Sequence, residues 1–202
     1  MTVTFLGTGT SQGVPVIACD CEVCQSVDYR DNRTRCSIMV KINNTKFIID
    51  IGPDFRAQML RERVQKIDAI LLTHEHKDHT GGLDDVRPFN FKYNMDMPVY
   101  ARKQVCEQLK KEYDYIFEPS PYPGAPRVIL NEVKNESFSV NETEIIPIEG
   151  YHRKLKVFGY RIEDFTYITD MNKIPDDEFK KISGTKTLVI NALQKEPHAS
   201  HF

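Results

Sequence analysis

The sequence predicts a mixed α/β fold, with one domain spanning residues 1–202. The chain has 40% hydrophobic and 28% charged residues, as in ordinary soluble domains large enough for a two-layer or sandwich core. In the first half, apolar β-rich runs alternate with segments of helical periodicity, whereas the second half consists mainly of β-rich runs. We therefore expect a core built from sheets, with helices joining several of the strands.

The first half contains the more varied elements. A strand at 3–6 runs into Gly7-Thr8-Gly9-Thr10, a glycine-permitted loop that is either a wall of the active site or a tight turn. Runs at 36–42 and 45–51 around Asn43-Asn44 predict a hairpin, with Cys36 in the core and Asp50 at the end of the second strand. The other predicted elements are a helix at 55–63, a buried strand at 67–72, a helical segment at 83–91, a strand at 97–101 and a helix at 103–113.

The second half consists mainly of predicted strands. Segment 113–126 interleaves aromatic residues with prolines, which predicts irregular structure. It is a substrate lid, a dimer contact or a plain connecting loop. Beyond it, the patterning predicts a helix at 174–182 and strands at 127–133, 137–140, 143–147, 155–162, 165–169 and 186–192.

The stretch 70–82 joins a buried strand directly to a cluster of metal-ligating side chains. Alternate residues of an extended segment point the same way, so His74 and His76 can converge on one cation. Asp78 and His79 then turn toward a second cation. Neutral imidazole suits zinc, manganese or iron, and a carboxylate binds a harder cation or bridges two. The pattern predicts a site for two metals roughly 3.5–4 Å apart.

Three of the five cysteines, Cys19, Cys21 and Cys24, lie within six residues. This density suits thiolate metal ligation better than a disulfide framework. No general acid or base lies among them, so we expect one structural zinc, which needs a fourth ligand to close its tetrahedron. The alternative is three reduced cysteines without a metal.

The charge and the hydropathy of the chain argue against two classes of partner, nucleic acid and membrane. A net charge of −2 and a pI near 6.3 give no electrostatic footprint for nucleic acid. The N-terminus lacks the basic start and long apolar run of a secretion signal, and no stretch approaches the roughly 20 apolar residues of a membrane span. We expect a cytoplasmic protein with a small-molecule substrate and neither a nucleic-acid nor a membrane partner.

The motif His74-x-His76-x-Asp78-His79 resembles the signature of the metallo-β-lactamase superfamily. The opening 4–15 (Thr-Phe-Leu-Gly-Thr-Gly-Thr-Ser-Gln-Gly-Val-Pro), the cysteine loop and the stretch 82–89 (Gly-Leu-Asp-Asp-Val-Arg-Pro-Phe) are similar to its PhnP-like branch, the cyclic-phosphate phosphodiesterases of phosphonate metabolism. The resemblance runs through residues 4–202. It implies a four-layer αββα sandwich, with two mixed sheets face to face, helices outside and the metals at one end of the sheets.

The resemblance also extends the set of expected ligands. In the superfamily a later histidine and then a metal-bridging aspartate follow the motif, and His152 and Asp170 come in that order, each at the end of a predicted strand. An acidic residue in the place of Asp50 supports the histidine loop in the superfamily. We therefore expect Asp50 to orient the ligands. The alternative for Asp50 is a turn former at a strand end.

Counting ligands leaves two vacancies. His74, His76 and His152 complete one set, but the second cation is short of one histidine and the cysteine site is short of one ligand. By spacing alone, His198 and His201 could fill these vacancies. The resemblance instead places the missing ligands in a later Thr-His-x-Ser-His segment, so that these 202 residues would lack the C-terminal helix and strand of the domain. It matches His201 to the histidine that protonates the leaving group.

The residues and the resemblance together imply a metal-dependent phosphoric diester hydrolase. The expected substrate is a small cyclic phosphate, such as a ribosyl cyclic phosphate. It is attacked by a hydroxide generated between two divalent metals, zinc or manganese, and held by Asp170, with His201 as general acid. The alternatives are another hydrolase of this fold, such as a tRNase Z-like nuclease, a thioesterase or a lactonase, or a non-catalytic metal-binding accessory protein. A homodimer is left open by the aromatic segment 113–126.

Overall fold

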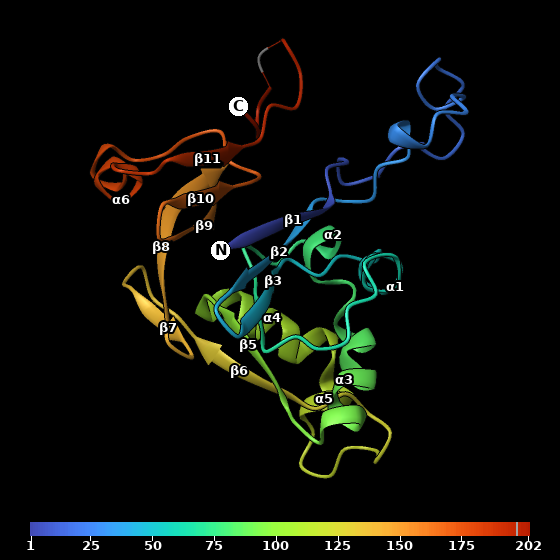
Figure 1. Cartoon of the computed structure of the whole chain (residues 1–202), viewed down its shortest axis with the longest axis vertical. Helices are drawn as coiled ribbons and strands as arrows, with labels where there is room; N and C mark the ends of the chain where they lie inside the picture. The colour runs from blue at the N-terminus through green and yellow to red at the C-terminus, as the bar shows by residue number, and fades with distance from the viewer. Residues whose placement is uncertain (197) are drawn as a thin grey trace.

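The computed structural model describes residues 1–196 and 198–202 and contains two mixed β-sheets with helices on their outer sides (Figure 1). The first sheet has six strands that are neighbours in chain order, antiparallel from β1 to β3 and parallel from β3 to β6. Its strands are β1 (Thr2–Gly7), β2 (Ser37–Ile42), β3 (Thr45–Ile49), β4 (Ala69–Leu71), β5 (Met97–Ala101) and β6 (Val128–Glu132).

The second sheet has five strands in the order β11-β10-β9-β8-β7. Only the β10–β11 pair is parallel; the other pairs are antiparallel. The strands are β7 (Phe138–Val140), β8 (Thr143–His152), β9 (Leu155–Ile162), β10 (Phe165–Ile168) and β11 (Thr187–Ile190).

Helices join the strands and cover the sheets. Short 3-10 turns lie at Tyr29–Asp31, Leu83–Val86 and Asp176–Glu178. The α-helices are α1 (Phe55–Arg61), α2 (Lys77–Thr80), α3 (Arg87–Tyr93), α4 (Lys103–Glu112), α5 (Asp114–Phe117) and α6 (Phe179–Ile182).

The central strands bury both faces, which explains their nearly continuous apolar sequence. In β3, Phe47 and Ile49 belong to a core that also contains Phe158 and Tyr160 of the second sheet, whereas Ile48 belongs to a core with residues of α1, α3 and α4. Because successive side chains of a strand point to opposite faces, one strand contributes to two layers of packing. The predicted buried strand at 67–72 is confirmed as β4, all three residues of which are buried.

A third core lies between the second sheet and α6. It contains Val157, Ile168 and Met171, with Ile174 and Ile182 packed against it. The layers therefore run helices, first sheet, second sheet, helix. This arrangement confirms the predicted αββα sandwich.

Several predicted elements differ from the structure. Segment 113–126, predicted to be irregular, begins with α5, and the helical segment predicted at 83–91 is a 3-10 turn followed by α3. The expected helix at 174–182 is a 3-10 turn followed by the single turn α6, because Glu178 turns inward and accepts hydrogen bonds from the backbone of Glu149 and the side chain of Asn135. Strand β8 does not end at Pro147 as predicted but continues to His152. The pairing of β8 with β7 ends at Ile145, so at Pro147 the strand is paired with β9 alone. Proline lacks a backbone N–H and is tolerated where a strand has only one neighbour.

The segment between β1 and β2 projects from the body of the two sheets (Figure 1). It contains the three clustered cysteines and several exposed apolar side chains, among them Ile17 and Val27. Among the residues described, no helix combines the length and the apolar character that crossing a membrane requires.

Candidate metal centre

The histidine motif lies where β4 ends and α2 begins. Backbone hydrogen bonds fix this loop on both sides: Leu72 donates to the carbonyl of Tyr100 at 3.0 Å, and Ile51 donates to the carbonyl of His79 at 2.8 Å. Gly82 donates in turn to the carbonyl of Ile51 at 2.7 Å. The loop is thus held between β5 and the turn that follows β3.

Two glycines allow that turn to approach the histidine loop. A Cβ atom at Gly52 would lie 2.0 Å from the carbonyl oxygen of Asp78, and one at Gly82 would lie 2.6 Å from Cβ of Phe55. Both distances are well inside van der Waals contact. A side chain at either position would therefore push α2 and its ligands out of place.

Tyrosine hydroxyls fix the two ends of the histidine loop. Tyr160 donates to the carbonyl of Leu72 at 2.6 Å, and Tyr113 donates to the carbonyl of Thr80 at 3.1 Å. Burial raises the pKa of Tyr113 to about 12, so its hydroxyl remains a donor at neutral pH. These contacts could not be predicted from local patterns, because both tyrosines are distant from the loop along the chain.

Asp50 organises the buried side of the site. As predicted, it lies behind the histidine loop, in contact with Thr73 and His79. The Asp50 carboxylate accepts hydrogen bonds from the backbone and the hydroxyl of Thr73, both at 2.8 Å, and lies 2.7 Å from Nδ1 of His79. A carboxylate only accepts, so Nδ1 of His79 carries the proton. Nε2 is therefore the ring nitrogen of His79 that faces the site and can bind a cation.

The same network assigns the tautomer of His74. The single hydroxyl proton of Thr73 goes to Asp50, so the hydroxyl oxygen accepts from Nδ1 of His74 at 3.0 Å. Nε2 of His74 is then free to bind a cation. Burial and the charge of His79 hold the pKa of His74 well below its usual range, which keeps the imidazole in the neutral form that metals require.

Three imidazoles converge as the first predicted ligand set. Nε2 of His74 lies 3.0 Å from Nδ1 of His76, and the ring of His152 lies 5.8 Å and 5.4 Å from those of His74 and His76, measured between centroids. Nδ1 of His152 donates to the carbonyl of Ser200 at 2.8 Å, leaving Nε2 free. The first sheet supplies two of these ligands and the end of β8 supplies the third.

Asp170 lies between this set and the second one. Its Oδ2 is 2.5 Å from Nε2 of His79 and 3.9 Å from Nε2 of His74, and Nε2 of His79 is also 3.3 Å from Oδ2 of Asp78. The backbone of Asp170 is in the left-handed region, with φ of 51°, as is that of Asp50, with φ of 63°. Such conformations persist where the surrounding structure fixes them, which is frequent at functional sites.

The donor atoms fit a cation on structural grounds. Nε2 of His79 is buried and faces the carboxylates of Asp170 at 2.5 Å and Asp78 at 3.3 Å. Burial alone would lower the pKa of His79, but the charges of Cys36 and Asp50 outweigh it and hold the pKa well above its usual value. A positive charge is therefore stabilised at this point, and a divalent cation supplies it more effectively than a proton.

His201 approaches the site from the C-terminal segment. Its Nδ1 lies 3.2 Å from Oδ1 of Asp170, and its ring centroid lies 4.9 Å from that of His152 and 5.1 Å from that of His198. The sequence spacing allowed His201 to complete either the histidine site or the cysteine site. In the structure it lies at the edge of the histidine site.

The cysteine loop brings its three sulfur atoms together. The sulfurs of Cys19, Cys21 and Cys24 lie within 4.8 Å of one another, and in the part of the chain that the structure describes no fourth histidine, cysteine or carboxylate joins them. The backbone N–H of Val16 donates to the sulfur of Cys24 at 3.3 Å. A hydrogen bond from the backbone of Cys24 lowers the pKa of Cys21, which favours the thiolate that zinc binds.

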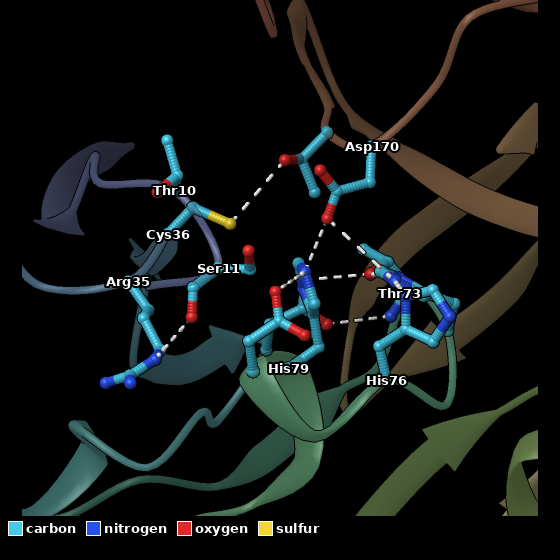
Figure 2. Close-up of polar contacts among 12 residues, drawn as sticks. Thr10, Ser11, Arg35, Cys36, Thr73, His76, His79 and Asp170 are labelled. Atoms are coloured by element: carbon cyan, nitrogen blue, oxygen red, sulfur yellow. Dashed lines mark hydrogen bonds and ion pairs between the residues drawn. The ribbon is translucent and has the colours of Figure 1, made fainter. Parts of the chain in front are cut away.

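The glycine-rich opening loop passes beside the histidine site. Gly9 donates to the carbonyl of Thr34 at 2.8 Å, and Nε of Arg35 donates to the carbonyl of Ser11 at 2.8 Å. Arg35 is itself paired with Asp54 at 3.0 Å. Figure 2 shows Thr10 and Ser11 among the residues drawn around the site, with the Ser11 carbonyl bonded to Arg35. This position favours the interpretation of the loop as a wall of the site.

Cys36 lies next to the histidine site, although the sequence analysis did not include it among the site residues. It was expected in the core, yet its sulfur lies beside His79 and Asp170 (Figure 2). The hairpin register contained the signal: Ile38 pairs with Ile49, which places the residues just before β2 opposite Asp50. The hydroxyl of Ser37 donates to the carbonyl of Asp50 at 2.7 Å, in agreement with that register.

Comparisons with known proteins agree on the fold. A family profile described as the β-lactamase superfamily domain matches residues 45–202. The crystal structure of a diphosphatase from the PhnP family superposes with a TM-score of 0.91 and 40% identity, covering 98% of this chain and 76% of that one.

Two curated relatives point to other reactions. The octanoyltransferase of Porphyromonas gingivalis is 39% identical over 204 residues, which are 100% of this chain and 41% of that protein. Ribonuclease Z of Staphylococcus epidermidis is 24% identical over 168 residues, which are 81% of this chain and 49% of that protein. The chain thus spans about half the length of the curated relatives it matches. Since fold alone does not decide the reaction, the reaction is argued from the site.

Proposed function

Because the chain belongs to the β-lactamase superfamily and to its PhnP branch, we propose that it is a metal-dependent hydrolase that cleaves a phosphodiester. The proposed substrate is a small cyclic phosphate, such as a ribosyl cyclic phosphate. The observation that carries this proposal is the position of Asp170, whose carboxylate faces Nε2 of His74 and Nε2 of His79, one from each ligand set. A carboxylate between two cation positions is the arrangement that a two-metal hydrolase needs.

The proposal assigns a role to each ligand. His74, His76 and His152 hold one divalent cation, zinc or manganese, and Asp78 and His79 hold the other, with Asp170 shared between them. When bound, two such cations polarise phosphoryl oxygens and make water a strong nucleophile at neutral pH. The buried Asp50 network keeps the imidazoles in the tautomer that binds metal.

His201 is the proposed general acid. Its side chain is mostly but not fully buried, and its Nδ1 contacts Asp170, so the ring is oriented at the rim of the site. Burial lowers the pKa of His201, so its imidazolium is a stronger acid but is populated mainly on the acidic side of neutral pH. A proton given to the leaving oxygen completes the cleavage of the ester.

A diphosphate is the second candidate substrate. It is favoured by the name of the 40%-identical PhnP-family structure, which is described as a diphosphatase. The chemistry of the two substrates is closely related, because in both a phosphorus–oxygen bond is broken and a charged oxygen leaves. The ligands assigned above would serve either reaction.

The test is hydrolysis by protein reconstituted with zinc or manganese. The substrates are a ribosyl cyclic phosphate, a nucleoside diphosphate, a chromogenic phosphodiester and a precursor tRNA. We expect turnover of the cyclic phosphate at a rate at least ten times that of the others. A preference for the diphosphate would overturn the proposed substrate but keep the proposed class of reaction. Cleavage of the tRNA alone would overturn the small-molecule substrate and the expectation that nucleic acid is not a partner.

Variants separate a true site from a contaminant. Asp170→Ala should abolish turnover while the circular dichroism spectrum stays native. Glu144→Ala is the matched control, because Glu144 is an exposed carboxylate of β8, the strand that ends at His152. Full activity of Asp170→Ala would contradict the proposal.

A further inference from the structure

The sulfur of Cys36 lies at the second ligand set. The Cys36 sulfur, a ring nitrogen of His79 and a carboxylate oxygen of Asp170 all lie within 4.8 Å of one another. They come from three separate parts of the chain: the residue before β2, helix α2 and the residue after Thr169. Figure 2 shows the three side chains around one space.

The distances suit ligation of one ion. Tetrahedral ligands at zinc, with Zn–S near 2.3 Å and Zn–N or Zn–O near 2.1 Å, lie roughly 3.5 Å apart. From separations of at most 4.8 Å, the donor atoms would close by up to about 1.3 Å around a cation, and the 2.5 Å pair of His79 and Asp170 would open by about 1 Å. Side-chain rotation alone provides movements of that size.

A second observation points to a ligand in this space. Nδ1 of His79 is committed to Asp50, and its buried Nε2 faces two carboxylates, that of Asp170 at 2.5 Å and that of Asp78 at 3.3 Å. Two carboxylates that converge on one buried imidazole nitrogen beside a sulfur form a donor set that suits a divalent cation. The sulfur of Cys36 has only a long contact, 3.6 Å, with the hydroxyl of Thr169.

We propose that Cys36 is a ligand of the cation held by His79, Asp78 and Asp170. This inference rests on the proposed metal-dependent function and deepens it. Ligation converts the Cys36 thiol to a thiolate, and the displaced proton leaves to the solvent. With one imidazole, two carboxylates and one thiolate, the second cation has four protein donors.

The consequence is metal selectivity. A thiolate is a soft ligand that favours zinc, whereas a set of carboxylates and imidazole alone accepts manganese as well. Cys36 therefore biases the second position toward zinc. Replacing it with serine, which keeps the size but supplies a hard oxygen, should shift the preference toward manganese.

Cobalt(II) spectroscopy tests the ligand directly. Protein is stripped of metal, given one equivalent of zinc for the cysteine loop, and then titrated with cobalt. Wild-type protein should develop a thiolate-to-cobalt charge-transfer band in the near ultraviolet. Cys36→Ser should still bind cobalt, seen in the visible d–d bands, but lose at least nine-tenths of the charge-transfer intensity.

Two other cysteines supply the controls. Cys21→Ser removes an exposed sulfur of the cysteine loop and should keep the band, which excludes cobalt in that loop as its source. Cys106→Ser changes a buried cysteine whose sulfur contacts the carbonyl of Ala101, far from the histidine motif in sequence, and should also keep it. A band lost in Cys21→Ser and kept in Cys36→Ser would overturn the proposal.

The outcomes separate this inference from the proposed function. Cobalt at the histidine site without a charge-transfer band in wild-type protein overturns the role of Cys36 and leaves the hydrolase proposal standing. Failure of wild-type protein to bind cobalt beyond the cysteine loop overturns both. If Cys36→Ser does not fold, the wild-type and Cys21→Ser spectra decide the matter by themselves. As a second readout, the ratio of zinc to manganese affinity should fall about tenfold or more in a folded Cys36 variant.

Discussion

Nδ1 of His79 lies 2.7 Å from Oδ2 of Asp50, and both side chains are completely buried. The contact fixes which nitrogen of His79 faces the candidate cations. Replacing Asp50 with asparagine keeps the shape but removes the charge and one acceptor lone pair. We expect zinc affinity at the histidine site to fall by about 10–100-fold. Competition with a chromogenic chelator measures it.

The matched control for Asp50→Asn is Asp164→Asn. Asp164 is half-exposed and pairs with Lys186 at the surface, so its replacement should leave zinc affinity unchanged. Equal affinities for the two variants would show that Asp50 does not orient the ligands.

Removing one hydroxyl should loosen the entrance to the histidine loop. Tyr160→Phe leaves the buried carbonyl of Leu72 without its donor, which costs about 1–3 kcal/mol of unfolding free energy. Urea denaturation measures the loss. Tyr122→Phe, at an exposed tyrosine, is the control and should change stability by less than about 0.5 kcal/mol.

Alkaline pH should release the other end of the loop. Burial raises the pKa of Tyr113 to about 12, above its ordinary value near 10. A tyrosine with a raised pKa stabilises the folded state below pH 10, and this contribution is lost as the pH rises toward 12. Unfolding free energy should therefore fall between pH 10 and 12, and the fall should be less steep in Tyr113→Phe. Identical slopes for the two proteins would refute this account.

Glycine at position 52 should be required for metal binding. Gly52→Ala places Cβ against the carbonyl of Asp78, a backbone atom that cannot rotate away. We expect a loss of about 1–3 kcal/mol in stability and weaker zinc binding. Gly124→Ala meets only the side chain of Tyr122 and should cost less, as judged by thermal melting of both variants.

The cysteine loop should respond independently of the sandwich. Cys21→Ser should lower the zinc content by one equivalent per chain and make the segment between β1 and β2 more sensitive to protease. The sheets should retain their melting temperature, because that segment projects away from them (Figure 1). Simultaneous loss of the whole fold would show that the loop is part of the core.

The sequence predicts those parts of the site in which local order decides geometry. His74, His76, Asp78 and His79 follow a buried strand, so spacing alone brings their side chains together. The strand and helix positions of the first half follow in the same way from apolar periodicity, as the two-faced burial of Phe47 and Ile48 illustrates.

The remaining features depend on partners far apart in sequence. Cys36 reaches His79 only through the hairpin register, and Tyr160 reaches Leu72 only when the two sheets pack. The helix expected at 174–182 is interrupted because Glu178 bonds to β8, a contact that no local pattern encodes. Tertiary contacts of this kind override local propensity.

The candidate site also has a mechanical consequence. The motif 74–79 follows β4 of the first sheet, whereas His152 ends β8 and Asp170 lies just after β10 of the second sheet. Each bound cation would therefore link the two sheets of the sandwich. A ligand that binds only the native state stabilises it by about 2.7 kcal/mol at a hundred times its Kd. Metal supply would then govern the lifetime of the folded chain as well as its chemistry, and starvation for metal would mark the protein for turnover by the cell's proteases.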